Sequence, residues 1–180
     1  MNFANKLKDV IRRLTGEVPT TTLVKRGLRV GKDFNRQQGC YIDPTHCFLI
    51  EIGNNVTFSI RVTVLAHDAS TKKILGYTKI GRVTVGDNVF VGANTTILPG
   101  VQIGNNVIIG AGSVVTHSIP DNMVVAGNPA KVICSVEDYK AKWTTRERVF
   151  EQSYRFSKAL TVDKIQEMRE ATKNGISFID

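Results

Sequence analysis

Three histidines are the side chains of this 180-residue sequence best suited to move a proton near neutral pH: His46, His67 and His117. A neutral imidazole can take a proton from a hydroxyl group and so act as a general base. His67 is the strongest candidate, because it stands with Asp68 where a regular apolar pattern gives way to a polar, basic stretch over residues 69–79. The alternative for each histidine is a surface position without a role in chemistry.

Other site chemistries find less support. The three histidines are 21 and 50 positions apart, so they do not share an element, and only a subunit interface would gather them around a metal. Cys40, Cys47 and Cys134 are odd in number and lack the spacing of a zinc site. Neither a G-x-S-x-G elbow nor a Gly-rich phosphate loop is present. We therefore expect free thiols, no nucleophilic serine or cysteine, and no metal.

The element that must position His67 is a repeat. An apolar β-branched residue returns every six positions, at Val85, Val91, Ile97, Ile103, Ile109 and Val115. Residues 85–102 also align with residues 103–120 at an offset of eighteen, with glycines at equivalent places. Six matches neither the helical period of 3.6 nor the strand period of 2. Eighteen is three sixes, so we predict a β-solenoid with three short parallel strands per turn and stacked apolar columns.

The remaining segments flank the solenoid. Residues 1–18 predict an N-terminal capping helix, stopped by Gly16 and Pro19. The coils are expected over residues 20–134, imperfect before residue 50, with about residues 69–79 ejected as a loop that is a natural place for function. Residues 135–180 predict a helical extension, with helices over 135–155 and 161–173 and Thr161 as the cap of the second.

Composition limits the partners. The net charge of +8 fits a solvated surface or a small ligand that carries phosphate. No basic cluster with aromatics or nucleic-acid motif is present, so no nucleic-acid partner is expected. No run of eighteen apolar residues occurs, and the first residues lack the apolar core of a secretory signal. With free cysteines in addition, the expected location is the cytoplasm.

The motifs over residues 52–133 resemble one family. They are LAHDAS (65–70), VGDNVFVGA (85–93), ILPGVQIG (97–104), VIIGAGSVVTHSIP (107–120) and VVAGNPAKVI (124–133). This run is similar to the hexapeptide-repeat acyltransferases, nearest to the maltose and galactoside acetyltransferases and the sugar O-acetyltransferases of polysaccharide biosynthesis. The resemblance implies an all-β, left-handed parallel β-helix, a homotrimer, and acetyl-CoA in a groove between adjacent prisms. Parallel crossovers are normally right-handed, so the hand comes from the resemblance alone.

The resemblance also assigns site residues. It makes His67 the general base. Its cofactor contacts fall on Ala111, on Thr116 and on His117, where the family's pair ends in lysine. Lys131 matches a basic position near the nucleotide end, and Cys134 a second one that has lost its charge. A family serine near the thioester corresponds to Ala93.

Small side chains lead to two further expectations. The pantetheine arm is expected along the turns at Gly92–Ala93 and Gly110–Ala111, and a backbone N–H near Gly92–Ala93 is the candidate oxyanion donor.

Asp43, His46 and Asp68 are candidate acceptor-binding residues. Adjacent strand residues point to opposite faces, so Asp68 is a poor candidate to orient the His67 ring. A carboxylate or carbonyl from elsewhere is expected to do so.

The leading hypothesis is therefore an acetyl-CoA-dependent O-acetyltransferase that acts on a hydroxyl of a sugar or sugar-containing acceptor, a small molecule or a glycan. Within the same fold, an N-acyltransferase on an amino sugar and a serine acetyltransferase remain open. From other classes, a γ-type carbonic anhydrase would need three histidines with two of them closely spaced. This sequence lacks such a pair. A trimeric scaffold without catalytic activity is the remaining alternative, which the AHDAS and GAGSVVT stretches argue against.

Overall fold

A computed structural model describes residue 12 and residues 16–144, 149–151 and 160–179. The chain divides into two compact units, residues 1–139 and 140–180. The predicted N-terminal helix lies outside the described residues, apart from Arg12 and the residues from Gly16 on. No helix among the described residues is both long enough and apolar enough to cross a lipid bilayer.

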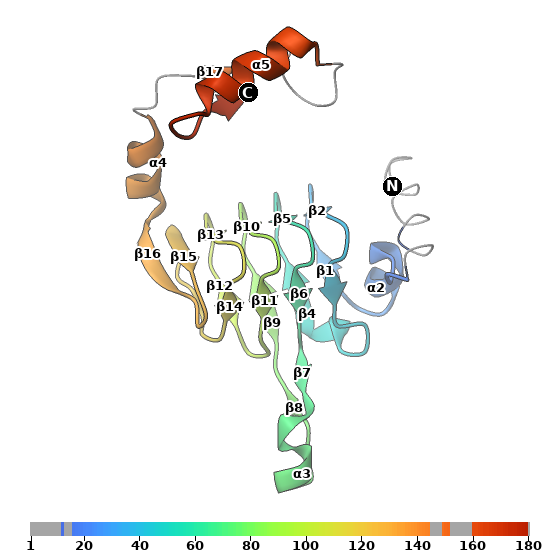
Figure 1. Ribbon diagram of the computed structural model, residues 1–180. Coiled ribbons are helices and arrows are strands. Elements are labelled where there is room, and N and C mark those ends of the chain that lie inside the picture. The colour runs from blue at the N-terminus through green and yellow to red at the C-terminus, as the bar shows by residue number, and fades with distance from the viewer. Residues whose placement is uncertain (1–11, 13–15, 145–148, 152–159, 180) are drawn as a thin grey trace. The chain divides into compact units, whose positions relative to one another are not determined.

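Three parallel sheets form the sides of a prism, and each coil contributes one short strand to each side (Figure 1). Side A consists of β1 (Arg29–Val30), β4 (Ile50–Ile52), β9 (Val83–Val85) and β12 (Gln102–Ile103). Side B consists of β2 (Asn35–Arg36), β5 (Thr57–Phe58), β10 (Phe90–Val91), β13 (Ile108–Ile109) and β15 (Met123–Ala126), with β16 (Lys131–Ser135) antiparallel at its edge. Side C consists of β3 (Tyr41–Ile42), β6 (Thr63–Val64), β11 (Thr96–Ile97) and β14 (Val114–Val115).

The register of these strands confirms the eighteen-residue repeat. Val85 pairs with Ile103 on side A, Val91 with Ile109 on side B, and Ile97 with Val115 on side C. All six side chains are buried in one hydrophobic core. In a two-residue strand one side chain points inward and the next outward, so a period of six places the same face of every strand in the core.

The corners of the prism depend on residues without a Cβ atom and on residues that adopt positive φ. Gly92 is needed for close stacking, because a Cβ at this position would lie 2.4 Å from the backbone nitrogen of Ala111 in the next coil. Positive φ is supplied instead by asparagines such as Asn88 (φ 57°) and Asn106 (φ 54°). The amide of Asn88 donates to the Oδ1 of Asn106 at 3.1 Å, so the side chains also link one coil to the next.

The N-terminal end of the stack differs from the prediction. Residues 20–25 form a helix, α2 (Thr20–Lys25), and the first strand begins only at Arg29. Leu23 of α2 is fully buried in the solenoid core, so tertiary packing overrides the weak helix propensity of a threonine-rich segment. Phe48 lies in a short 3-10 helix, η1 (Cys47–Leu49), and is 55% exposed, so this segment does not continue the repeat.

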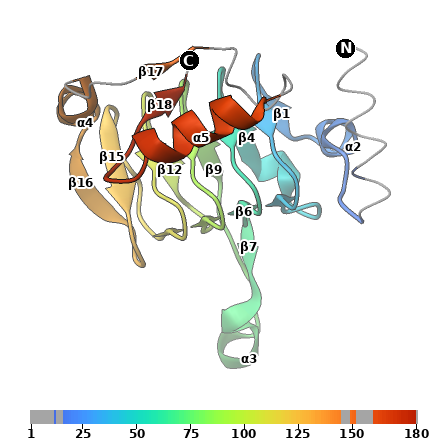
Figure 2. The same cartoon turned by 45° about the horizontal axis from the view of Figure 1, so that its top comes forward.

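The predicted loop leaves the prism as a hairpin. Strand β7 (His67–Asp68) pairs antiparallel with β8 (Lys79–Ile80), and between them lie η2 (Ala69–Thr71) and α3 (Lys72–Leu75). Figures 1 and 2 both show this excursion projecting away from the coils. The chain then re-enters side A at β9. His67 therefore stands at the base of the excursion, as expected from the sequence.

The C-terminal segment is only partly helical. α4 (Val136–Thr144) follows β16 directly, and α5 (Val162–Ala171) begins after Thr161, whose side chain accepts a hydrogen bond from the Lys164 N–H. The expected helix over 135–155 is too long, because Val149–Phe150 form strand β17, which pairs in parallel with β18 (Phe178–Ile179). Such long-range pairing of two short apolar runs leaves no periodic signal in the sequence.

Candidate active site

The candidate site lies where the chain turns from side C to side A, a place we call the C–A corner. Asp43 directly follows β3, and His67 comes three residues after the end of β6. Ile42 of β3 pairs with Val64 of β6, so the two turns stack on each other. The stacked coils therefore bring together two residues that are 24 positions apart in the sequence.

Asp43 and His67 form a hydrogen-bonded pair of which the carboxylate is buried and the imidazole partly exposed. The Nδ1 of His67 lies 2.5 Å from the Oδ2 of Asp43, whose side chain is 0% exposed, whereas the His67 side chain is 32% exposed. The Oδ2 also accepts the backbone N–H of Ala66 at 3.2 Å. The carboxylate is thus enclosed by the fold, and the imidazole reaches from it to the surface.

The local sequence around Asp43 explains why the carboxylate points inward. Its Oδ1 accepts the backbone N–H of Thr45 at 3.0 Å and that of His46 at 3.1 Å, and the Thr45 hydroxyl donates to it at 2.7 Å. Pro44 fixes φ between them, so Asp-Pro-Thr-His folds into a tight turn around the aspartate side chain.

These contacts decide the charge of the pair. Burial by itself would raise the pKa of Asp43, but hydrogen bonds from His67, from the Thr45 hydroxyl and from two backbone N–H groups outweigh it and lower the pKa to about 2. Asp43 is therefore ionised at neutral pH and only accepts hydrogen bonds. Nδ1 of His67 must carry the proton between them. In the neutral ring, Nε2 is then free to accept a proton.

A second histidine belongs to the same cluster. The His46 ring lies 4.7 Å from the His67 ring, centroid to centroid, at an interplanar angle of 37°. Its Nδ1 is 2.9 Å from the Thr45 hydroxyl and 3.8 Å from the Oδ2 of Asp43. The ring of Phe48 lies 5.9 Å from that of His46, centroid to centroid. Two imidazoles and an exposed aromatic ring thus gather over one buried carboxylate.

The cluster could also hold a metal ion. Asp43, His46 and His67 each offer one ligand atom, and the three atoms lie within 4.8 Å of one another. Two imidazoles and a carboxylate suit a divalent transition metal. The sequence spacing of the histidines concealed this arrangement, because Asp43 and His46 precede the inserted η1 helix and His67 follows on the next coil.

Comparison with known proteins identifies the family. Residues 82–117 match the family model described as bacterial transferase hexapeptide (six repeats). A candidate acetyltransferase of Saccharomyces cerevisiae is 35% identical over 153 residues, which covers 80% of this chain and 78% of that protein. The chain belongs to the hexapeptide-repeat acetyltransferase family.

Other proteins match this chain over shorter ranges. Protein CapG of Staphylococcus aureus is 48% identical over 99 residues, covering 53% of this chain and 58% of CapG. A crystal structure of a maltose O-acetyltransferase from Clostridium difficile has a TM-score of 0.53 at 40% identity, covering 61% of this chain and 59% of that one. An acetyltransferase structure from Vibrio cholerae, complexed with acetyl-CoA, has a TM-score of 0.55 at 24% identity, over 61% of each chain.

These relatives confirm the predicted fold class, an all-β, left-handed parallel β-helix of hexapeptide repeats. The likeness to the Vibrio cholerae structure concerns the fold alone. This chain spans somewhat less than two thirds of the length of CapG and of both structures.

The hexapeptide-repeat coils place the predicted cofactor residues on two different corners. Gly92, Ala93 and Ala111 lie in turns between side B and side C, which form the B–C corner. Thr116 and His117 follow β14 and lie on the C–A corner, two coils beyond His67, with the Thr116 hydroxyl 2.8 Å from the Nδ1 of His117. Side C separates the residues of the B–C corner from those of the C–A corner. Within one chain they therefore do not form a single site.

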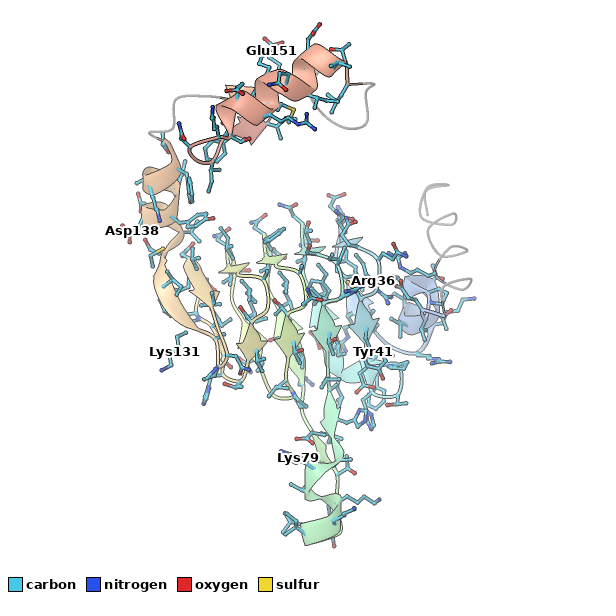
Figure 3. All side chains as sticks on the ribbon, in the orientation of Figure 1. Arg36, Tyr41, Lys79, Lys131, Asp138 and Glu151 are labelled. Atoms are coloured by element: carbon cyan, nitrogen blue, oxygen red, sulfur yellow. The ribbon has the colours of Figure 1, made fainter. Side chains whose placement is uncertain are left out.

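Two further predicted residues lie away from the Asp43–His67 pair. Asp68 belongs to the excursion, where it forms an ion pair with Lys79 at 2.7 Å and accepts the Ser70 N–H. The Lys79 contact is the main cause that lowers the pKa of Asp68 to about 2. Lys131 begins β16, at the far edge of side B; Figure 3 shows it toward the opposite end of the stack from Tyr41, which precedes the site.

Proposed function

We propose that this protein is an acetyl-CoA-dependent O-acetyltransferase that acts on a hydroxyl of a sugar or sugar-like acceptor. The observation that carries the proposal is the 2.5 Å contact between Asp43 and His67 at the base of the excursion. A buried, ionised carboxylate that fixes the tautomer of a partly exposed imidazole is the arrangement a general base requires. The similarity to a maltose O-acetyltransferase supports a sugar acceptor.

In the proposed reaction His67 takes the proton of the acceptor hydroxyl at Nε2 while the hydroxyl oxygen attacks the thioester carbonyl carbon. The C–S bond then breaks, and the leaving thiolate of CoA takes this proton from the imidazolium of His67. Asp43 stays ionised and stabilises the imidazolium through the hydrogen bond to Nδ1. A free hydroxyl is hardly ionised at neutral pH, so a positioned base of this kind contributes about 10²–10⁴-fold.

The oxyanion that forms in this attack needs a fixed donor. The backbone N–H of Gly92 already donates to the carbonyl of Ile109 at 2.8 Å, so it is committed to the sheet. Gly92 itself is buried by the next coil. The candidate donor therefore narrows to the N–H of Ala93, which begins the exposed part of the B–C corner.

Acetyl-CoA as the acyl donor is supported by the length of the stack. The coil that carries His67 and strand β16 are four strand spacings apart on side B. At a strand separation of about 4.8 Å this amounts to about 19 Å along the axis. An extended ligand with a thioester at one end and phosphates at the other would reach from His67 toward Lys131, passing the exposed turn at Ala111. The same fold holds acetyl-CoA in the Vibrio cholerae protein.

A homotrimer is part of the proposal. The base at the C–A corner and the small turns at the B–C corner lie on opposite edges of side C, so a second prism must bring its B–C corner against His67 to complete the site. The excursion has the exposed apolar residues such a contact would cover, among them Ile74 and Tyr77. Each groove would then belong to two chains.

The test is release of CoA from acetyl-CoA, followed with a thiol reagent, in the presence of a panel of methyl pyranosides, amino sugars and serine. We expect a pyranoside to support turnover and His67→Ala to lower kcat at least a hundredfold while acetyl-CoA still binds in calorimetry. A variant within tenfold of wild type would remove His67 from the role of base. Turnover with serine or an amino sugar alone would favour the corresponding alternative.

A further inference from the structure

We infer that His46 is a specificity-determining residue, and that it selects acceptors with two neighbouring hydroxyl groups. The inference rests on the proposed function, because it assigns the second hydroxyl of an acceptor whose first hydroxyl loses its proton to His67. Its basis is the hydrogen-bond chain that runs from Asp43 to both histidines.

The Thr45 hydroxyl fixes the tautomer of His46. This hydroxyl has one proton and lies 2.7 Å from the Oδ1 of Asp43 and 2.9 Å from the Nδ1 of His46. An ionised carboxylate is the stronger acceptor, so the hydroxyl proton goes to Asp43. The contact with His46 must then use the proton on Nδ1 of the ring. In neutral His46 the Nε2 atom therefore carries no proton and can only accept a hydrogen bond.

The same carboxylate thus orients two imidazoles in the same way. Nδ1 of His67 donates to Asp43 directly, and Nδ1 of His46 donates to it through Thr45. The rings are tilted by only 37° with centroids 4.7 Å apart. Both Nε2 atoms consequently face away from the buried carboxylate as a pair of acceptors, and both side chains are about one-third exposed.

Two adjacent acceptors call for two adjacent donors. Vicinal hydroxyls on a six-membered ring provide them, one to each Nε2. The hydroxyl on His67 is the one that attacks, and the hydroxyl on His46 holds the ring in place. The exposed ring of Phe48, 5.9 Å from His46, adds an apolar surface for the face of such a ring. A ligand with a single hydroxyl leaves the His46 acceptor without a partner, which a site of this kind penalises.

The test uses the smallest rings that carry the feature: cyclohexanol, cis- and trans-1,2-cyclohexanediol, and 1,3-cyclohexanediol, each with saturating acetyl-CoA. We expect at least one 1,2-diol to exceed cyclohexanol about tenfold in kcat/KM, the size of one hydrogen bond, and the 1,3-diol to gain much less. His46→Phe keeps an aromatic ring but no acceptor, so its ratio of 1,2-diol to cyclohexanol should fall to about one, whatever its absolute activity.

Two amide variants are the matched controls. In His46→Gln the amide takes the place of Nε2, so the preference for the 1,2-diol should persist in part. In His46→Asn the amide reaches only the place of Nδ1, next to Thr45, so the preference should be lost, and this variant serves also if His46→Phe does not fold. A ratio that stays at the wild-type value in both Phe and Asn variants would show that His46 only packs.

Failure of this inference is distinct from failure of the proposed function. An enzyme that acetylates no acceptor of any kind overturns both. An enzyme that acetylates a pyranoside but prefers neither 1,2-diol over cyclohexanol, or accepts none of the four rings, overturns the assignment of His46 alone.

Discussion

Asp43 and His67 lie 24 residues apart in the sequence, yet the Oδ2 of one is 2.5 Å from the Nδ1 of the other. The stacking of β3 on β6 brings them together, and the Asp-Pro-Thr-His turn saturates the second carboxylate oxygen with three donors. The carboxylate therefore has little freedom to leave the imidazole. The role of Asp43 can therefore be tested by substituting this residue.

Replacing Asp43 by Asn should lower kcat about a hundredfold or more, with a smaller effect on the KM for acetyl-CoA. The amide cannot accept on both sides, so His67 loses the partner that keeps the proton on Nδ1 and leaves Nε2 free. Steady-state kinetics of CoA release measure the effect. Asp87→Asn, at an exposed corner where the side chain accepts from Asn54, is the matched control and should stay within about twofold.

The low pKa of Asp43 also predicts a pH dependence of stability. The pKa falls from 3.8 to about 2 on folding, so the ionised form stabilises the folded state above pH 4, and this contribution is lost as the pH falls toward 2. Its size is about 2 kcal/mol. Urea unfolding of wild type and Asp43→Asn should therefore show a stability difference that shrinks by this amount between pH 5 and pH 2. A difference that stays constant would contradict the ionised buried carboxylate.

The six-residue period predicted the columns of the core and the place of His67, but not its partner. Ile42 and Val64 pair on side C and so place Asp43 at the corner beside His67, but they are 22 positions apart, which is not a multiple of six. The turn and η1 helix between Ile42 and Ile50 break the period, so spacing alone did not determine which coil stacks on which. From the sequence we therefore expected an orienting group from elsewhere and gave Asp43 a role in acceptor binding.

Segments without a period were harder to predict. Strand β17 pairs with β18 almost thirty residues later in the chain, and such a contact depends on tertiary packing rather than on local sequence. In the first coil, Arg36 occupies the inward position of side B in register with Phe58. It is held there by the carbonyl of Val18 and by Glu17, which a hydrophobic pattern cannot anticipate.

The metal-binding potential of the cluster gives a test of the alternative class. If His67 acts as a base, treatment with EDTA should leave CoA release unchanged, whereas micromolar Zn²⁺ should inhibit by occupying Asp43, His46 and His67. His46→Phe removes one ligand and should raise the inhibitory concentration at least tenfold. Hydration of CO₂ that is lost in EDTA and recovered on adding Zn²⁺, without release of CoA, would instead favour a metal-dependent enzyme of the carbonic anhydrase type.

The stacking of the coils predicts a cost for a single methyl group at Gly92. Its Cβ would meet the backbone of Ala111 at 2.4 Å, and a backbone contact cannot be relieved by a rotamer change. Gly92→Ala should destabilise the protein by about 1–3 kcal/mol in urea unfolding. Gly175→Ala adds the same group where no atom lies within 4 Å and should change stability by less than about 0.5 kcal/mol. Equal effects at both positions would contradict the close approach.

The exposed apolar residues of the excursion allow a test of the proposed trimer. Ile74 is 82% exposed and Tyr77 78% exposed, and a surface of this kind is stable in water when a neighbouring chain covers it. Ile74→Ser combined with Tyr77→Ser should shift the mass measured by light scattering at micromolar concentration from trimer toward monomer. The specific activity should fall in parallel, because each groove would lose half of its walls.

Val162→Ser provides the comparison, since Val162 is 80% exposed but lies on α5. It should leave the trimer intact. If Val162→Ser dissociates the protein while the excursion variant does not, the contact between chains involves the C-terminal unit. A wild-type protein that is monomeric and fully active would contradict the proposal of a groove shared by two chains. In a monomer the B–C corner cannot meet the His67 of another chain.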